Sequence, residues 1–359
     1  MIPSTLIYNL MMLAVDLAAL AVLWRQRRAR LWWTTVIGVA AAAAVLAVAM
    51  GLSHFHVFQL AAFGLFGHGP IVLCGSAWLL RREARKTAVF SAVTAVLLVA
   101  VVVDAFLIEP TWLEISKIEI VSSKITKPVR IVVLADLQTD ELTAYERAAF
   151  RRAIEQKPDL LLLAGDYVQL YGGRRKAFIK RINAMLRELE LPADCQAFAV
   201  KGNIDPLDWP TIFAGTPIKP VTETGSIDVA GLRLTCLDDY ASNNPSLQID
   251  RSDQGRFHVV LGHRPDYAMS RLVDADLMLA GHTHGGQVCL PVIGPILTLS
   301  DSPRSWASGM TELSGGRKLI VSRGVGMERG GAPRLRFLCR PELVVIDLKP
   351  VGRGLPRRN

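Results

Sequence analysis

Apolar residues are concentrated in the first third of this 359-residue chain, and this constrains the fold more than any other feature. Up to about residue 110 the chain is mostly Ala, Val, Leu and Phe, and it contains four runs of the roughly 20 residues needed to cross a bilayer. The runs cover residues 5–24, 32–53, 57–80 and 87–108. Repeated runs argue against one cleavable signal peptide. We therefore predict an all-α transmembrane region of about four helices over residues 1–110 and a globular domain over residues 111–359.

The positive charges of the apolar region favour one membrane orientation. Basic residues cluster after the first run (Arg25, Arg27, Arg28 and Arg30) and after the third (Arg81, Arg82, Arg85 and Lys86). The positive-inside rule places both clusters in the cytoplasm. The expected protein is a multi-pass protein of a bacterial inner membrane, with its globular domain on the extracytoplasmic side. Glycines and Pro70 interrupt the third run, and if that run does not span, the domain lies inside.

The net charge of +9 comes largely from these clusters, so it indicates membrane topology rather than nucleic-acid binding. No nucleic-acid partner is expected, because no RNA-binding signature or basic helix with interleaved aromatic residues occurs. Asp16 and His68 fall inside predicted spans, where ionisable groups are candidates for function. The alternative is that Asp16 pairs with a neighbouring helix and His68 marks a kink.

The globular part shows alternating strand and helix patterns. Residues 116–125 alternate polar and apolar, as in a half-exposed strand, and helices are expected near 142–156 and 174–190. Buried or partly buried strands are expected at 129–135, 160–164, 197–200, 226–230, 232–237, 257–262, 275–280, 318–322 and 343–348. Helix and strand alternate first and strands dominate later, which predicts an α/β fold with helices packed over two stacked mixed sheets.

Polar side chains follow five of the expected strands. These are Asp136, Asp166, Asn203, His263 and the pair His282 and His284. Sites collect at the carboxyl ends of strands in open α/β sheets. Three of the four histidines of the globular part lie at these junctions, which disfavours ordinary core or surface histidines.

Residues 281–287 (GHTHGGQ) are the most distinctive of these junctions. A glycine-rich turn after a buried strand can direct two imidazoles to one point, and neutral imidazole is the commonest metal ligand. A polar loop with incidental histidines is the alternative for an isolated pair. The upstream junctions favour a metal site.

These motifs in order resemble those of the calcineurin-like metallophosphoesterases. The family carries D-x-H, G-D, G-N-H-D, a lone His and G-H-x-H. Here they read Asp136-Leu137-Gln138, Gly165-Asp166, Gly202-Asn203-Ile204-Asp205, Gly262-His263 and Gly281-His282-Thr283-His284. The bacterial membrane-associated branch is most similar, with R-G-x-G at residues 323–326 and P-E at 341–342. The resemblance covers about residues 116–348 and implies a four-layer α/β/β/α sandwich.

The resemblance also implies two divalent metal ions. One would be held by Asp136, Gln138, Asp166 and His284, and the other by Asp166, Asn203, His263 and His282. Asp166 would bridge them, and Asp166, Asn203 and His263 would be catalytic. Two such cations polarise a phosphoryl group and activate a water for in-line attack.

Two positions depart from the family pattern. Gln138 replaces a histidine and moves the ligand set toward oxygen, which suits Mn²⁺ better than Zn²⁺, with Fe or Zn²⁺ as alternatives. Ile204 replaces the histidine that serves the transition state or the leaving group, a loss on the order of 10²–10⁴ in rate. A substrate with an acidic leaving group is therefore expected, unless Asp205 or His258 acts as the acid. Arg264 and Arg323 are either phosphate clamps or salt-bridge partners.

The leading hypothesis is a membrane-anchored, metal-dependent phosphodiesterase or pyrophosphatase acting on a lipid-linked or nucleotide-linked phosphate at the membrane surface. Its expected partners are that substrate and membrane lipids. One alternative is a catalytically silent relative that acts as a metal-binding or ligand-binding sensor or scaffold. Another is a transporter with an attached domain.

Five cysteines are present, and none forms a C-x-x-C pair, which makes a structural zinc knuckle unexpected. Four lie in the globular part, at residues 195, 236, 289 and 339. They are buried free thiols or, in an exported domain, two disulfides, and their spacing does not decide between these.

Overall fold

The computed structural model describes residues 3–250 and 255–351. The described residues form two compact units. A helical unit comprises the residues up to Ile108 together with the segment Glu328–Arg334. A globular unit comprises Glu109–Met327 and the described residues from Leu335 onward.

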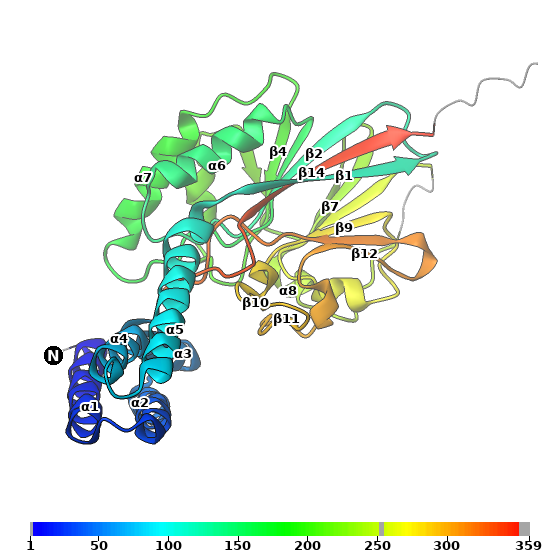
Figure 1. Ribbon diagram of the computed structural model, residues 1–359. Coiled ribbons are helices and arrows are strands. Elements are labelled where there is room, and N and C mark those ends of the chain that lie inside the picture. The colour runs from blue at the N-terminus through cyan, green and yellow to red at the C-terminus, as the bar shows by residue number, and fades with distance from the viewer. Residues whose placement is uncertain (1–2, 251–254, 352–359) are drawn as a thin grey trace, which may run out of the picture. The chain divides into compact units, whose positions relative to one another are not determined.

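The helical unit contains the four apolar helices that the sequence predicts (Figure 1). Its elements are α1 (Ser4–Gln26), α2 (Ala29–Met50), α3 (His54–Ala62), the π-helix η1 (Phe63–His68), α4 (Gly69–Leu80), α5 (Arg85–Val103) and the π-helix η2 (Asp104–Ile108). The helices Ser4–Gln26, Ala29–Met50, His54–Leu80 and Arg85–Thr111 are each long and apolar enough to cross a membrane. The interrupted third run is therefore one continuous helical rod of 27 residues.

Asp16 and His68 pair with each other inside the helical unit. His68 Nδ1 lies 2.6 Å from Asp16 Oδ2, and its Nε2 lies 3.1 Å from Asn9 Oδ1. His68 also ends the π-helical turn η1, a local widening of the helix. The structure thus favours the alternative in which these residues make an interhelical contact at a helix irregularity.

The globular unit contains two six-stranded mixed sheets (Figure 1). The first has the order β1 (Glu114–Ser122), β14 (Glu342–Pro350), β2 (Val129–Leu134), β3 (Leu160–Leu163), β4 (Gln196–Ala199) and β5 (Ile218–Pro220). The second has the order β12 (Gly309–Glu312), β13 (Lys318–Val321), β9 (Leu277–Ala280), β8 (His258–Leu261), β7 (Leu232–Cys236) and β6 (Gly225–Val229). A short hairpin is formed by β10 (Cys289–Leu290) and β11 (Gly294–Pro295).

Alternate residues of the central strands serve two different cores. Along β2, Val132 and Leu134 join the cluster under α6 (Ala144–Glu155) and α7 (Arg175–Arg187), while Ile131 and Val133 join the cluster between the sheets. The two-residue period of a strand explains this division, because both faces of each central strand are covered. Burial of both faces explains why these strands appear in the sequence as unbroken apolar runs.

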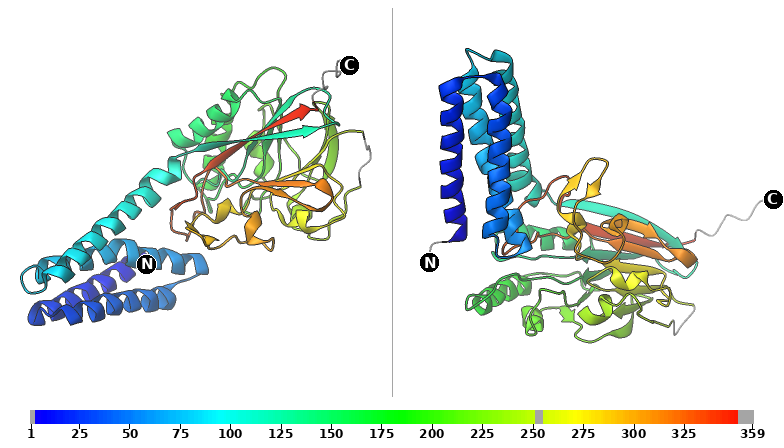
Figure 2. Two further views of the ribbon diagram at one scale, coloured as in Figure 1. Left: turned by 45° about the vertical axis from the view of Figure 1, so that its right-hand side comes forward. Right: turned by 90° about the horizontal axis from the view of Figure 1, so that it is seen from below.

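The layers form the predicted α/β/β/α sandwich (Figure 2). On the outer face of the second sheet, a third cluster includes Ala241 of the short helix α8 (Asp239–Ser242) and Tyr267 of the 3₁₀ turn η5 (Asp266–Met269). This outer layer is thin. The central strands are parallel within each sheet, β2 to β4 in the first and β7 to β9 in the second. Their carboxyl ends therefore lie on the side of the loops that carry the polar side chains.

Candidate metal centre

The structure gathers the predicted ligand residues at the carboxyl ends of strands from both sheets. Asp136, Asp166 and Asn203 follow β2, β3 and β4 of the first sheet, and His263 and His282 follow β8 and β9 of the second. The two sheets stack face to face, so these loops meet across the layer between them. His284 extends the set from the turn that follows His282.

Most of these residues have a left-handed backbone. The φ angles are 49° at Asp136, 33° at Gln138, 55° at Asp166, 71° at His282 and 49° at His284. Non-glycine residues seldom adopt this region, and such strain concentrates at functional sites. The sharp turns direct each side chain back over its strand end toward the others.

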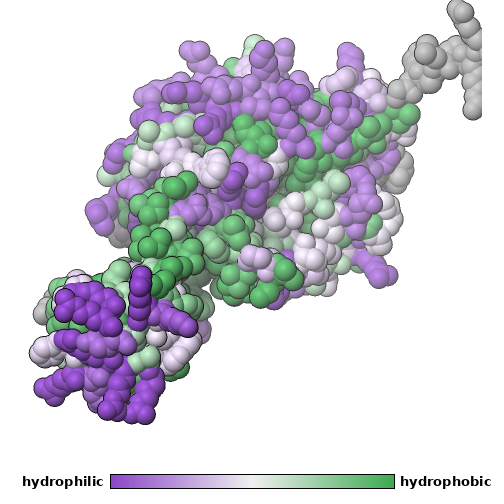
Figure 3. Space-filling model, in the orientation of Figure 1, coloured by the Kyte–Doolittle hydropathy of each residue, from purple (hydrophilic) through white to green (hydrophobic). Residues whose placement is uncertain are grey.

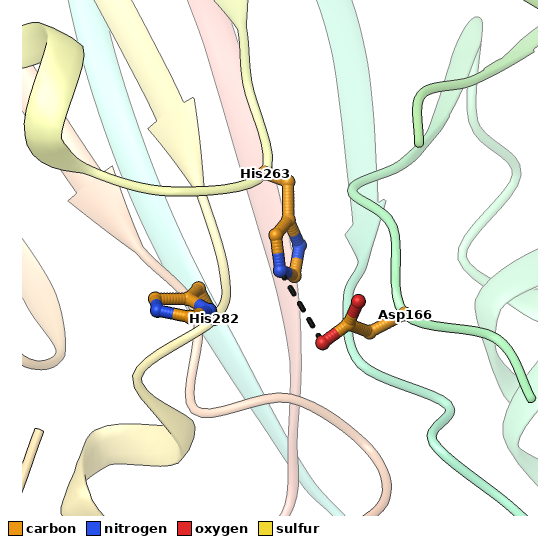
Figure 4. A group of neighbouring side chains, drawn as sticks. All are labelled: Asp166, His263 and His282. Carbon is orange, nitrogen blue, oxygen red and sulfur yellow. Dashed lines mark ion pairs between the residues drawn. The ribbon is translucent and has the colours of Figure 1, made fainter. Parts of the chain in front are cut away.

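Asp166, His263 and His282 form the centre of the cluster (Figure 4). One ligand atom from each lies within 4.8 Å of the others, and all three residues are buried. His263 Nδ1 donates to the carbonyl oxygen of Ala164 at 2.7 Å, so Nε2 faces Asn203 Oδ1 at 2.9 Å and Asp166 Oδ2 at 3.3 Å. One nitrogen and two oxygens therefore converge on one point.

A backbone N–H group of residues 281–287, here called the histidine turn, holds the Asp136 carboxylate. Both of its carboxylate oxygens accept from the backbone N–H of His282, at 3.1 and 3.0 Å. Gln138 accepts from His284 Nε2 at 2.5 Å through Oε1 and donates to Gln169 Oε1 at 3.0 Å. This leaves His284 Nδ1 buried without a hydrogen-bond partner.

The donor set fits a divalent cation. His282 donates from Nε2 to the Leu299 carbonyl oxygen at 3.0 Å, which leaves its Nδ1 as the acceptor, and the nitrogen of His284 that faces the Gln138 oxygen is Nε2. Burial, with added repulsion from His263 and Arg264, lowers the pKa of His282 to about 3. Burial and Arg336 hold the pKa of His284 well below its usual value. Both imidazoles are thus neutral, as metal ligation requires.

The carboxylates also indicate a site built for positive charge. Burial, opposed by His263 and reinforced by the neighbouring Asp166, raises the pKa of Asp136 to about 7. Burial alone would lower the pKa of His263, but Asp166 and its hydrogen bond raise it to about 9. A buried pair of carboxylates with the neutral imidazoles of His282 and His284 is a set that divalent metals bind in proteins.

Asp205 and His258 do not replace the missing acid at position 204. The Asp205 carboxylate accepts from the backbone N–H groups of Asp166, Tyr167 and Gly202 at 2.8, 2.8 and 2.9 Å, so it positions the Asp166 loop. His258 begins β8 and bonds Thr235 and the Asp274 carbonyl oxygen, at the opposite end of the strand from His263. These contacts disfavour the alternative in which Asp205 or His258 supplies the acid.

Arg264 and Arg323, the two candidate phosphate clamps, differ in their contacts. Arg323 Nη2 lies 3.1 Å from carboxylate oxygens of both Glu114 and Glu342, so the structure favours the salt-bridge alternative for it. This pair links the R-G-x-G and P-E motifs, a connection that the sequence does not reveal. Arg264 lies near the site, since its charge contributes to lowering the pKa of His282, and its Nε is 3.7 Å from Asp239 Oδ1.

Arg336 is a supporting residue that the sequence reasoning missed. It is fully buried and donates to the carbonyl oxygens of Gly326, Cys339, Arg323, Gly324 and His284. An arginine in a polar loop normally suggests exposure, and no spacing signal marks this one. It stabilises the histidine turn and the R-G-x-G turn together.

The β10–β11 hairpin and the residues just after it carry exposed apolar side chains next to the cluster of predicted metal ligands. Leu290, Val292, Ile293, Ile296, Leu297 and Leu299 are all exposed, with 64% of Ile293 accessible. Apolar side chains gather over this hairpin in the space-filling view (Figure 3). Pro295 of the hairpin packs against Gly286 of the GHTHGGQ turn, and the carbonyl oxygen of Leu299, four residues after the hairpin, lies 3.0 Å from His282 Nε2. Contiguous exposed apolar patches mark interaction or ligand-binding surfaces.

The fold and these strand-end ligands define a metallophosphoesterase-type α/β sandwich. The chain belongs to the calcineurin-like phosphoesterase family, whose model matches residues 129–286. That family binds divalent metals and hydrolyses phosphoesters.

Several bacterial proteins are similar to this chain. An uncharacterized metallophosphoesterase, YkuE of Bacillus subtilis (strain 168), is 32% identical over 54% of this chain and 69% of its own length. The phosphodiesterase YaeI of Escherichia coli (strain K12) is 30% identical over 67% of this chain and 90% of its own length. An uncharacterized metallophosphoesterase of Aquifex aeolicus (strain VF5) is 26% identical over 71% of this chain and 99% of its own length.

Proposed function

We propose that this chain is a membrane-anchored, two-metal phosphoesterase that hydrolyses a phosphodiester or pyrophosphate bond. The convergence of Asp166, His263 and His282 within 4.8 Å, with Asn203 beside them, carries the proposal. The likeness to the phosphodiesterase YaeI supports a diester substrate.

The residues divide between two ions as follows. Asp136, Gln138, Asp166 and His284 would hold the first, and Asp166, Asn203, His263 and His282 the second. When bound, the ions supply Lewis-acid polarisation of the phosphoryl group and acidify a water. The protein fixes the ligands: Asp205 holds the Asp166 loop, Ala164 orients His263, and Gln169 orients Gln138.

The oxygen of Gln138 favours Mn²⁺ as the resident metal. Five of the seven ligand residues offer imidazole or carboxylate groups, while Gln138 and Asn203 offer amide oxygens, which suit Mn²⁺ better than Zn²⁺. Metal analysis of the purified chain, combined with reactivation by Mn²⁺, Fe²⁺ or Zn²⁺ after chelation, tests this preference.

The substrate has an acidic leaving group. Ile204 contributes only its backbone N–H, which donates to Asp166 Oδ1 at 3.0 Å, and neither Asp205 nor His258 is placed as an acid. A nucleotide or sugar phosphate leaves without protonation, whereas an alkoxide does not. Pyrophosphates and activated diesters are therefore preferred to alkyl monoesters. Equal turnover of both classes by the Mn²⁺-loaded protein would contradict this preference.

The substrate also has an apolar part. Exposed apolar residues of the β10–β11 hairpin border the cluster, and the same chain has four helices that are long and apolar enough to cross a membrane. A lipid-linked phosphate at the membrane surface satisfies both features.

The decisive experiment compares the wild type with Asp166→Asn. Metal content and hydrolysis of bis-p-nitrophenyl phosphate are measured on both proteins in detergent. The proposal expects bound metal and activity in the wild type and loss of both in the variant. A wild type without metal or activity would support a silent sensor or scaffold instead.

A further inference from the structure

Two cysteines lie next to each other beneath the histidine turn. Cys289 begins β10, and Cys339 lies three residues before β14. Their segments run side by side: Cys289 N–H donates to the Phe337 carbonyl oxygen at 2.9 Å, and Phe337 N–H donates to the Gln287 carbonyl oxygen at 3.0 Å. Val288 and Phe337 form a parallel bridge between them. The backbone therefore fixes the two cysteines in one register.

Both thiols point to the same oxygen. Cys289 Sγ is 3.3 Å and Cys339 Sγ is 3.5 Å from the Gly285 carbonyl oxygen, and the two thiols lie in contact with each other. Cys339 Sγ is also 3.2 Å from the His284 carbonyl oxygen. Arg336 holds Cys339 in place through its carbonyl oxygen at 2.9 Å. The pair is thus assembled by the surrounding structure before any bond joins the sulfurs.

The two thiols differ in access. Cys339 is only 2% exposed, whereas Cys289 is partly exposed at the base of the hairpin. An oxidant from solution therefore reaches Cys289 first, and Cys339 is the neighbouring thiol that resolves the reaction.

We propose that Cys289 and Cys339 are a modification site that forms an intramolecular disulfide with a disulfide-class oxidant such as oxidised glutathione. The Cys289 thiolate attacks one sulfur of the oxidant and releases one thiol, which gives a mixed disulfide. The Cys339 thiolate then attacks the Cys289 sulfur and releases the second thiol. The two cysteines lose two electrons and two protons, and the oxidant gains them as two thiols.

The disulfide would tie two segments beside the candidate metal centre together. It joins the hairpin to the loop before β14, where both thiols lie against the turn that carries His284. Cross-linking segments far apart in the chain restricts the unfolded state and stabilises the folded one. The proposal does not depend on the hydrolase function, and an oxidising extracytoplasmic location would favour the disulfide.

The test uses the full chain, purified in detergent and equilibrated in glutathione buffers from reducing to oxidising. Free thiols are blocked with iodoacetamide after denaturation, and tryptic peptides are analysed by mass spectrometry. We expect a peptide pair joined through Cys289 and Cys339, lighter by about 2 Da than the two thiol peptides. Cys195 and Cys236 should remain fully alkylated.

Matched variants separate this bond from general oxidation. Cys289→Ser and Cys339→Ala should each remove the cross-link, and Cys236→Ser should keep it. Oxidation should raise the apparent Tm of the wild type and of Cys236→Ser, and leave that of Cys289→Ser unchanged. Alkylation of both thiols in every wild-type sample, or pairing of either with another cysteine, would overturn the proposal even if the variants misfold.

Discussion

Gly202 has no room for a side chain, because a Cβ there would lie 2.0 Å from Asp166 Oδ1. Gly202→Ala should displace the carboxylate that is proposed to bridge the two ions. We expect kcat/KM for bis-p-nitrophenyl phosphate to fall by about 100-fold or more, since small misplacements of catalytic groups have effects of this size. Bound metal should fall in parallel. Gly173→Ala is the matched control, because its added Cβ meets nothing within 4 Å.

Arg336 is a buried cation that donates to five backbone carbonyl oxygens. Arg336→Met removes the guanidinium donor from all five, although the oxygens of Gly324 and His284 each keep a backbone N–H donor, and the cost is on the order of 3 kcal/mol. The apparent Tm of the detergent-solubilised protein should fall by about 6–12 °C. Arg181→Met on the exposed face of α7 is the control and should change Tm little. An unchanged Tm for Arg336→Met would show that these hydrogen bonds contribute no net stability.

The β10–β11 hairpin gives an element-scale prediction. If it contacts the apolar part of the substrate, Val292→Asp combined with Ile293→Asp should lower kcat/KM for a lipid-linked phosphate in vesicles by at least about tenfold. Hydrolysis of the soluble substrate bis-p-nitrophenyl phosphate should stay near the wild-type value. Val121→Asp, on the exposed side of edge strand β1, is the control. Equal loss on both substrates would indicate a damaged centre instead.

Most elements were predictable because their patterns are local. Apolar runs identified the central strands, and α6 begins at the capping box of Thr143 and Glu146. The strands β5, β10, β11 and β12 were not predicted, because they are only two to four residues long and too short to show a periodic pattern. The parallel pairing of β1 with β14 joins residues from Glu114 to Pro350 and leaves no local signal.

The clustering of Asp136, Asp166 and the histidines could be predicted from the sequence, but the contacts that support them could not. Strand ends and glycines mark Asp136, Asp166 and His282, because such positions have few structural uses for a buried polar side chain. The contacts of Asp205 with three N–H groups and the burial of Arg336 depend on how loops fold back in space. Residue types and spacing do not encode those contacts.

At the scale of the whole molecule, metal should contribute to stability. The globular unit buries the carboxylates of Asp136 and Asp166 beside each other, and a ligand that binds only the folded state stabilises it. Treatment with a chelator should lower the apparent Tm by about 5–10 °C, and excess Mn²⁺ should restore it. Asp166→Asn should show a much smaller response to both treatments. A wild-type Tm that is insensitive to chelation would contradict a structural contribution of bound metal.

The orientation of the chain in the membrane is the last prediction. Arg27 and Glu83 form an ion pair at 2.8 Å, so the two basic loops, which follow α1 and α4, lie at the same end of the helical unit. The positive-inside rule assigns that end to the cytoplasm, and the C-terminal unit is then extracytoplasmic. Alkaline phosphatase fused after Asn359 should be active, and the same reporter fused after Arg82 should be inactive at equal expression. The reverse pattern would place the metal centre in the cytoplasm, where the disulfide of Cys289 and Cys339 would be kept reduced.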